Sequence, residues 1–182
     1  MMDNRRIALV AYVRTPAGQF VERLQREFLP ESPYFAAHLT LLPPRCLEGS
    51  EASALDDLKD TCLEVEPFGV TLGEVETFIP VTPTLFIRVE QAAARMIALH
   101  SKMNRGALAA QEQWPYIPHL TIAKMDSEHE ARKAFTVARE QWEKFSGSRE
   151  ILVSDLTFVR EEEPGRWQDV AGIPLGRGVV RR

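Results

Sequence analysis

The sequence has few cysteines and no long hydrophobic run, and these absences exclude several classes of protein. Its 182 residues include two cysteines, Cys46 and Cys62, which are too few for a disulfide framework and whose spacing matches no zinc motif. No apolar segment approaches the roughly 18 residues of a membrane-spanning helix. The apolar stretch 7–13 follows two arginines, but it is short and runs directly into Arg14, so a strand is expected there and not a signal peptide. The small number of cysteines and the lack of a membrane-spanning or signal segment favour a cytoplasmic protein with no membrane partner.

The sequence also lacks an excess of positive charge and the motifs of the common nucleotide and metal enzymes. A formal net charge of −4 argues against a non-specific binder of long nucleic acid, but it leaves room for a small phosphate ligand in a local basic pocket. There is no Gly-x-x-x-x-Gly-Lys-Ser/Thr loop, no Gly-x-Gly-x-x-Gly fingerprint and no His-Glu-x-x-His pair. The four histidines are too dispersed for a zinc cluster. We therefore expect no metal and no resident cofactor.

What the chain does contain is the composition and periodicity of a soluble globular domain. Hydrophobic residues make up 45% and charged residues 26%, so a sizeable core can form without covalent cross-links. The hydrophobic pattern predicts strands at 7–13, 35–42, 68–79, 85–90, 116–124 and 150–159, and helices at 18–28, 50–65, 91–105 and 127–145. The C-terminal tail is either a final strand or a loose end. We treat residues 1–182 as a single domain.

The two halves of the chain repeat one order of elements: strand, helix, strand, helix, strand. The approximate repeats are residues 5–82 and 83–160, and the second strand of each contains the tripeptide His-Leu-Thr at nearly the same distance from the first strand. Identity between the halves is low outside this tripeptide. The pattern indicates an internal duplication and predicts two lobes related by an approximate two-fold axis.

The tripeptides His38-Leu39-Thr40 and His119-Leu120-Thr121 are the clearest candidates for function. In a strand, residues i and i+2 project to the same face, so the histidine and threonine of each motif point together while the leucine faces the core. A single histidine in an apolar strand is more often a hydrogen-bonded core or edge residue. Two copies at matching positions favour a shared cleft lined by both motifs.

Two histidines and two threonines in one cleft suit phosphoryl transfer by general acid–base catalysis. Histidine titrates near neutral pH, so one imidazole can accept a proton while the other donates one. In-line displacement at phosphorus requires a base on the attacking side and an acid on the leaving side. Threonine hydroxyls can donate hydrogen bonds to the non-bridging oxygens, where charge is held in the transition state. This chemistry requires no metal.

The paired motifs, with their flanking apolar residues, resemble those of the 2H phosphoesterase superfamily, and its 2′–5′ RNA ligase-like branch in particular. The similarity in plan covers Ile7–Val159 and implies an α+β fold of two lobes, each an antiparallel sheet with helices on its outer face, around a central cleft. It implies metal-independent activity on 2′,3′-cyclic phosphates or 2′–5′ phosphodiester bonds of RNA ends or small nucleotides. On this resemblance, His38 and His119 are catalytic, and Thr40 and Thr121 bind the phosphate.

Three cations are further candidates for contact with the substrate. Lys124 matches a basic position often found after the second motif in that branch, whereas Arg45 follows the first motif at a longer offset. Either residue is a phosphate ligand or a solvated cation at a strand end. Arg88 lies on the polar face of its predicted strand and is a candidate for reaching the cleft.

Four aromatic residues precede the motifs: Tyr34, Phe35, Trp114 and Tyr116. An aromatic side chain there can stack on a base or pack in the core. Tyr34 and Tyr116 are the candidates chosen for stacking.

Two alternatives to an enzyme remain at this point. A module of the same fold could bind nucleotides or RNA ends without turnover, although intact histidines and threonines argue against lost catalysis. A purely structural domain predicts that no cleft joins the motifs. We expect a monomer whose partner is a small nucleotide or RNA end. The physiological substrate, the direction of the reaction and the identity of the base stay open.

Overall fold

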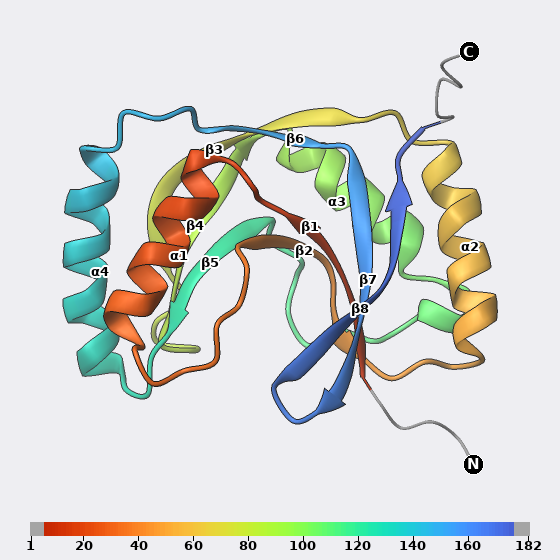
Figure 1. Ribbon diagram of the computed structural model, residues 1–182, viewed down its shortest axis with the longest axis horizontal. Coiled ribbons are helices and arrows are strands. Elements are labelled where there is room, and N and C mark those ends of the chain that lie inside the picture. The colour runs from red at the N-terminus through yellow and green to blue at the C-terminus, as the bar shows by residue number, and fades with distance from the viewer. Residues whose placement is uncertain (1–5, 177–182) are drawn as a thin grey trace.

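The computed structural model describes residues 6–176, which form one curled sheet and four α-helices (Figure 1). The strands are β1 (Ile7–Tyr12), β2 (His38–Arg45), β3 (Phe68–Thr77), β4 (Thr84–Gln91), β5 (His119–Lys124), β6 (Glu150–Val153), β7 (Asp155–Glu163) and β8 (Arg166–Pro174). The helices are α1 (Pro16–Phe28), α2 (Glu51–Leu63), α3 (Ala93–Met103) and α4 (Glu128–Glu143), with a short 3₁₀ turn, η1, at Gly106–Leu108. Within residues 6–176, no helix combines the length and the hydrophobicity required to cross a membrane.

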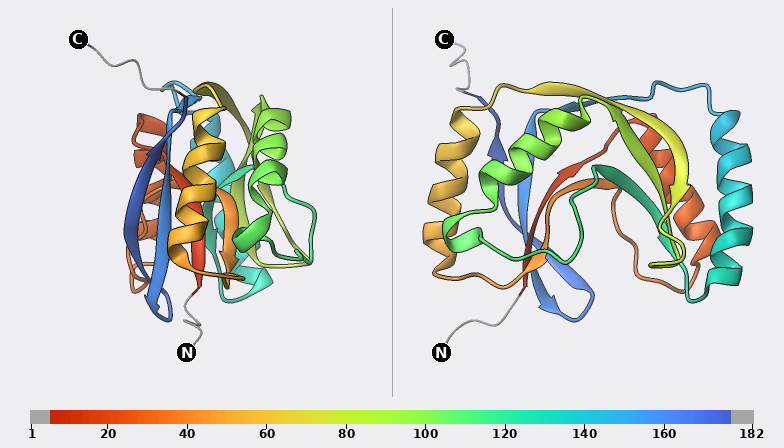
Figure 2. Two further views of the ribbon diagram at one scale, coloured as in Figure 1. Left: turned by 90° about the vertical axis from the view of Figure 1, so that its right-hand side faces the viewer. Right: turned by 180° about the vertical axis from the view of Figure 1, so that it is seen from behind.

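The eight strands form a single antiparallel sheet in the order β6-β3-β4-β5-β2-β1-β7-β8. The fold is α+β, as predicted, but the expectation of a separate sheet in each lobe is wrong. The two motif strands, β2 and β5, pair with each other at Leu39 and Leu120 and so join the two halves of the sheet. The continuous sheet then curls from one pair of helices to the other (Figure 2).

Each half of the sheet combines strands from both halves of the sequence. β3, from residues 5–82, pairs with β4 and β6. β7, which begins in residues 83–160, pairs with β1 and β8. The spatial halves are therefore β6-β3-β4-β5 and β2-β1-β7-β8, with one histidine–threonine motif in each.

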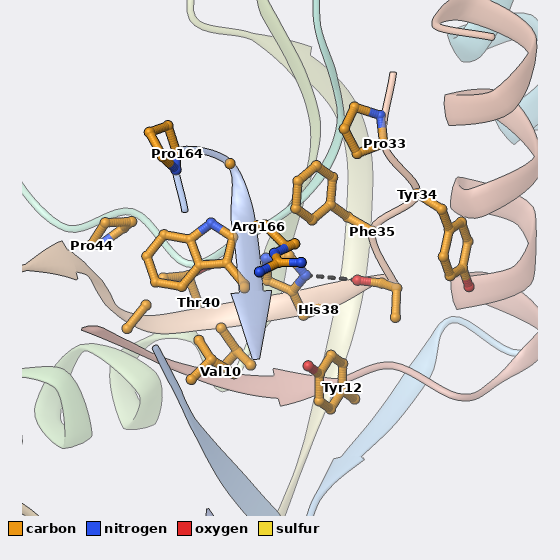
Figure 3. Close-up of a pocket in the computed structure, with 15 residues that line it drawn as sticks. Val10, Tyr12, Pro33, Tyr34, Phe35, His38, Thr40, Pro44, Pro164 and Arg166 are labelled. Atoms are coloured by element: carbon orange, nitrogen blue, oxygen red, sulfur yellow. Dashed lines mark hydrogen bonds between the residues drawn. The ribbon is translucent and has the colours of Figure 1, made fainter. Parts of the chain in front are cut away.

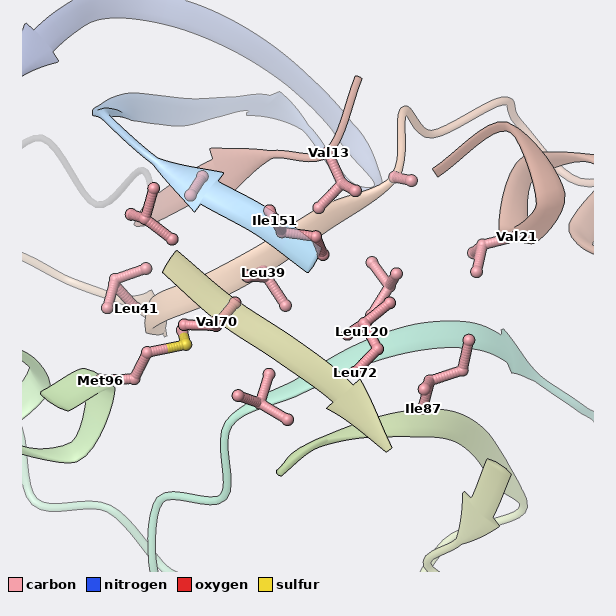
Figure 4. Close-up of a cluster of buried hydrophobic side chains, with 14 of the residues drawn as sticks. Val13, Val21, Leu39, Leu41, Val70, Leu72, Ile87, Met96, Leu120 and Ile151 are labelled. Atoms are coloured by element: carbon pink, nitrogen blue, oxygen red, sulfur yellow. The ribbon is translucent and has the colours of Figure 1, made fainter. Parts of the chain in front are cut away.

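All four helices contribute to one hydrophobic core on one face of the sheet. α1 and α4 lie at one end of the molecule, and α2 and α3 at the other (Figure 1). Leu39 and Leu120 are fully buried in this core, together with side chains such as Met96 of α3 and Trp142 of α4. Figure 4 shows Leu39 and Leu120 pointing into the same cluster. We call this the core face of the sheet, and the opposite face the site face.

Local signals explain where two helices begin. The side chain of Ser50 accepts a hydrogen bond from the Ser53 amide at the start of α2, and Ser127 accepts one from the Glu130 amide at the start of α4. At α4 the hydroxyl of Ser127 also donates to the Glu130 carboxylate.

Several boundaries differ from those predicted. The motif strands begin at His38 and His119, later than the predicted strands at 35–42 and 116–124. The predicted strand at 150–159 is two strands, β6 and β7, which lie in opposite halves of the sheet. They separate at Ser154, whose carbonyl accepts a hydrogen bond from the Leu175 amide next to the Asp155–Pro174 pair of β7 and β8. Residues 166–174 of the tail form β8, the sheet edge.

Candidate active site

The side chains of the two motifs lie together at the centre of the site face. Because Leu39 pairs with Leu120 and both face the core, their neighbours on each strand project to the opposite face. His38, Thr40, His119 and Thr121 are all half-buried there. Their position on adjacent strands, at the joint between the two halves of the sheet, brings two imidazoles and two hydroxyls to one place.

The two imidazoles are oriented by the same local contact. Nδ1 of His38 lies 2.7 Å from the carbonyl oxygen of Ala36, and Nδ1 of His119 lies 2.6 Å from that of Ile117. A carbonyl oxygen can only accept, so Nδ1 carries the hydrogen and donates it. In the neutral imidazole, Nε2 is then the basic nitrogen. Both rings therefore use Nε2 for any proton transfer.

Burial lowers the pKa of both histidines, and neighbouring positive charge adds to the effect at His119. Desolvation lowers the pKa of His38 and, together with the neighbouring charges of His38 and Arg88, lowers the pKa of His119. A proton on one ring therefore disfavours a proton on the other. Such a pair titrates as a unit and favours states with at most one proton. An anion between the rings would reverse this preference by stabilising the positive charge.

Aromatic rings surround His119 and limit its movement. Phe78 meets the imidazole edge-on with centroids 5.2 Å apart, and Phe86 does so at 5.1 Å. On the other motif, Tyr12 approaches His38 with centroids 6.4 Å apart, and its hydroxyl donates to Asp169. Burial raises the pKa of Tyr12, so the phenol stays protonated. These walls lower the local polarity, which strengthens electrostatic interactions at the histidines.

Tyr116 supports the first motif instead of presenting a free stacking face. Its hydroxyl donates to the carbonyl oxygen of Thr40 at 2.7 Å, and its ring stacks on His100 with centroids 4.0 Å apart. His100 in turn contacts the Leu41 carbonyl through Nδ1 at 2.7 Å. These contacts fix the β2 backbone at the two residues that directly follow Leu39, the residue where β2 pairs with β5.

Arg45 was a candidate phosphate ligand, but its side chain is buried and its guanidinium is hydrogen-bonded to protein atoms. Its guanidinium donates to the carbonyl oxygens of Pro43 and Leu108, to the Asn104 amide oxygen and to the Glu112 carboxylate. The side chain is 3% exposed. The contacts give Arg45 a structural role in tying β2 to the segment that leads into β5.

The other predicted residues lie around the site at different distances from its centre. Lys124 is exposed and lines a cavity of about 330 Å³ together with His38 and Thr121. Arg88 pairs with His119 in the β4–β5 register, and its guanidinium forms a two-bond contact with Glu76 at 2.6 and 2.8 Å.

Tyr34, the remaining predicted residue, is 59% exposed. It lines a cavity of about 480 Å³ beside His38, with the guanidinium of Arg26 over its ring. The tyrosine therefore borders the site without being packed into the core.

The hairpin of β7 and β8 contributes side chains that the sequence analysis did not single out. Pro164, Arg166 and Trp167 line the cavity beside His38 and Thr40. Figure 3 shows Arg166 and Pro164 on the hairpin side of this cavity, with Phe35 on its other wall. The turn dipeptide Pro164-Gly165 and the tryptophan Trp167 are sequence signals that could have marked the hairpin.

No cluster of three or more histidine, cysteine, aspartate or glutamate side chains is arranged to hold a metal ion within residues 6–176.

The fold and the paired motifs define a class, and comparison with known proteins identifies it. The model of the 2′-5′ RNA ligase superfamily matches residues 13–165, so the chain belongs to this family. The resemblance inferred from the motifs is thereby confirmed.

Two similar relatives are described as predicted phosphoesterases. One from Oceanobacillus iheyensis is 32% identical over 110 residues, which cover 59% of this chain and 62% of that protein, less than two thirds of its length. One from Bacillus cytotoxicus is 28% identical over 158 residues, which cover 85% of this chain and 88% of that protein. The chain is therefore similar over most of its length to predicted phosphoesterases.

Solved structures show the same fold at low sequence identity. Escherichia coli LigT, crystallised with phosphate, superimposes with a TM-score of 0.64 at 14% identity, covering 96% of this chain and 99% of LigT. A crystal structure described only as a phosphoesterase gives 0.62 at 15% identity, with 96% and 100% covered. The curled sheet with four helices is thus a LigT-like fold.

Proposed function

We propose that the protein is a metal-independent phosphoesterase that cleaves 2′,3′-cyclic phosphates or 2′–5′ phosphodiester bonds of RNA ends or small nucleotides. The observation that carries the proposal is the matched pair of imidazoles on adjacent strands, each oriented by a backbone carbonyl two residues before it. LigT structures were determined with phosphate, with ATP and with 3′-AMP, which supports a phosphate-containing nucleotide as the ligand class.

In this mechanism one histidine is neutral and the other is protonated. With a 2′,3′-cyclic phosphate, the neutral imidazole removes a proton from the attacking water while the oxygen bonds to phosphorus. The protonated imidazole gives its proton to the ribose oxygen as its bond to phosphorus breaks. His38 and His119 fill these two roles, and their equivalent backbone contacts are compatible with either assignment.

The threonines and Lys124 would hold the charge of the phosphate during this step. The hydroxyls of Thr40 and Thr121 flank the histidines on the site face, where they can donate hydrogen bonds to non-bridging oxygens. Lys124 lines the cavity that includes Thr121, so its ammonium group can add positive charge from the β5 side.

A panel of 2′,3′-cyclic mononucleotides and 2′–5′ linked dinucleotides tests the proposal, with chromatography of the products as the readout. We expect turnover by the native protein and none by the double variant His38→Ala/His119→Ala, which controls for contaminating phosphodiesterases. Turnover that persists in the double variant contradicts the proposal. Binding of these ligands without turnover would instead favour the non-catalytic module.

A further inference from the structure

Two cavities flank the joint between the motif strands, and both include Thr40. The first, of about 480 Å³, contains His38 and lies between the loop before β2 and the β7–β8 hairpin. The second, of about 580 Å³, contains His119 and lies between residues 78–82 and residues 110–117. Each volume is in the range of sites for small organic ligands. A phosphate held at Thr40 would therefore lie beside both cavities.

Each cavity offers one indole ring. Trp167 is half-buried in the first cavity, where it packs against Ala8, Val10 and Val159 on the site face. Trp114 lines the second cavity and is 58% exposed. A nucleobase can stack on an indole whatever its sequence identity, because every base has a π-face.

The third tryptophan shows what a structural indole looks like in this protein. Trp142 is fully buried, its Nε1 donates to the Gly73 carbonyl at 2.8 Å, and its ring stacks on Phe145 with centroids 4.8 Å apart. Trp114 is far more exposed to solvent than Trp142, so packing in the core does not account for its presence. Its location in the cavity beside His119 points to a ligand contact.

From these observations we propose that the site has two base-binding subsites, one at Trp167 beside His38 and one at Trp114 beside His119. The preferred substrate then carries a nucleoside on each side of the scissile phosphate. A 2′–5′ dinucleotide fills both subsites, whereas a 2′,3′-cyclic mononucleotide fills only one. This inference rests on the proposed function for the position of the phosphate, and it specifies which substrate of the class is favoured.

Kinetics of Trp114→Ala and Trp167→Ala on the two kinds of substrate test the inference. On 2′–5′ linked diadenosine monophosphate, each variant should lower kcat/KM by about 5- to 150-fold, the effect of losing one base stack. On adenosine 2′,3′-cyclic phosphate, only one of the two variants should lower it. Tryptophan-to-phenylalanine variants should retain most of the rate because they keep an aromatic face.

Two controls separate lost stacking from lost folding. Leu152→Ala removes an apolar side chain that is 66% exposed on the edge strand β6 and lines neither cavity, so it should leave both substrates unaffected. Thermal midpoints identify any variant that unfolds, and the loss of ligand-induced fluorescence quenching in the phenylalanine variants then carries the test. Sensitivity of the dinucleotide to one tryptophan alone, or to neither, would overturn the two-subsite inference.

Binding to a catalytically inactive protein distinguishes failure of the inference from failure of the proposed function. The variant His38→Ala/His119→Ala is titrated with the same dinucleotide, and tryptophan fluorescence is recorded. Trp142 supplies a constant background, while Trp114→Phe and Trp167→Phe should each remove part of the quenching. Quenching at both positions without turnover by the native protein supports the subsites and refutes the proposed function. Turnover without quenching at both positions refutes the subsites, and absence of both binding and turnover refutes the two proposals together.

Discussion

At the scale of single residues, the two histidines share one arrangement: Nδ1 held by a carbonyl and Nε2 available on the site face. We predict that His38→Ala and His119→Ala each lower kcat on the true substrate by on the order of 10²–10⁴-fold, the usual contribution of a general acid or base. The double variant should lose less than the product of the two, because the groups act as a unit. Single-turnover rates measure this, and near-native rates in both single variants would disprove the two-histidine mechanism.

The same histidines make stability depend on pH. Burial lowers their pKa below the ordinary value of about 6.5, so the unfolded chain binds more protons than the native protein below that pH. The free energy of unfolding therefore falls as the pH decreases from about 7 towards the native pKa values. We predict that the thermal midpoint drops less between pH 7 and pH 5 in His38→Gln or His119→Gln than in the native protein. Circular dichroism melts give the comparison, and equal drops would contradict it.

The sequence predicted that the histidine and threonine of each motif share one face, because strand alternation alone places residues i and i+2 together. It could not assign Arg45, since the offset from the motif does not reveal whether a cation points to solvent or inward. In the structure Arg45 meets Glu112 and Asn104, which are far away in the sequence. The role of Tyr116 was hidden for the same reason, because its partners His100 and Thr40 come from other elements.

At the scale of elements, the contacts of Arg45 hold β2 to the segment before β5. We predict that Arg45→Leu lowers the free energy of unfolding by about 3–5 kcal/mol, because it removes the buried guanidinium that pairs with the Glu112 carboxylate. The control is Arg132→Ala, which breaks an ion pair with Glu128 that is 65% and 51% exposed and should cost less than about 1 kcal/mol. Urea denaturation measures both, and equal costs would refute the structural role.

The start of α1 depends on a close approach to the end of the first strand. A Cβ at Gly18 would lie 1.8 Å from the carbonyl oxygen of Val13, a contact that cannot be relieved without moving the backbone. We predict that Gly18→Ala destabilises the protein by about 1–3 kcal/mol or more. At Gly69 of β3 no atom lies within 4 Å of the added Cβ, so Gly69→Ala should change stability by less than about 0.5 kcal/mol. Similar losses in the two variants would show that the close approach is unimportant.

The helices and strands could be predicted from local periodicity, but the residues at which they begin and end could not. All four helices and the strands containing the motifs are present where the hydrophobic pattern placed them. The division of 150–159 into β6 and β7 has no strong local signal, because Ser154 is an ordinary strand residue in isolation. Only pairing with distant strands, β3 on one side and β1 on the other, decides that the chain changes its place in the sheet.

At the scale of the whole molecule, the two proposed proton carriers both belong to the chain itself. We predict that turnover of 2′,3′-cyclic nucleotides is unchanged by EDTA, because the imidazoles of His38 and His119 supply both proton transfers. A metal-dependent phosphodiesterase assayed in parallel confirms that the chelator is effective. Loss of activity on chelation, with recovery on adding a divalent metal, would contradict the prediction.

The repeated order of elements could be recognised in the sequence, but the pairing that connects the strands could not. Repeated element order predicted two lobes, each with its own sheet. The pairing of Leu39 with Leu120, which merges the sheets, depends on two strands that are distant in the chain and follows from no local pattern.

The crossing of β3 and β7 between the halves determines how the chain can be divided. A fragment ending after β3 would contain β1, β2 and β3, while their neighbours β7 and β4 would lie in the other fragment. Neither fragment would contain all the strands of one half of the sheet. Cleavage between β3 and β4 would therefore not produce a fragment that can fold on its own. The histidines of β2 and β5 thus belong to one cooperative folding unit. A protein split at this point could form the site only if its two fragments associate.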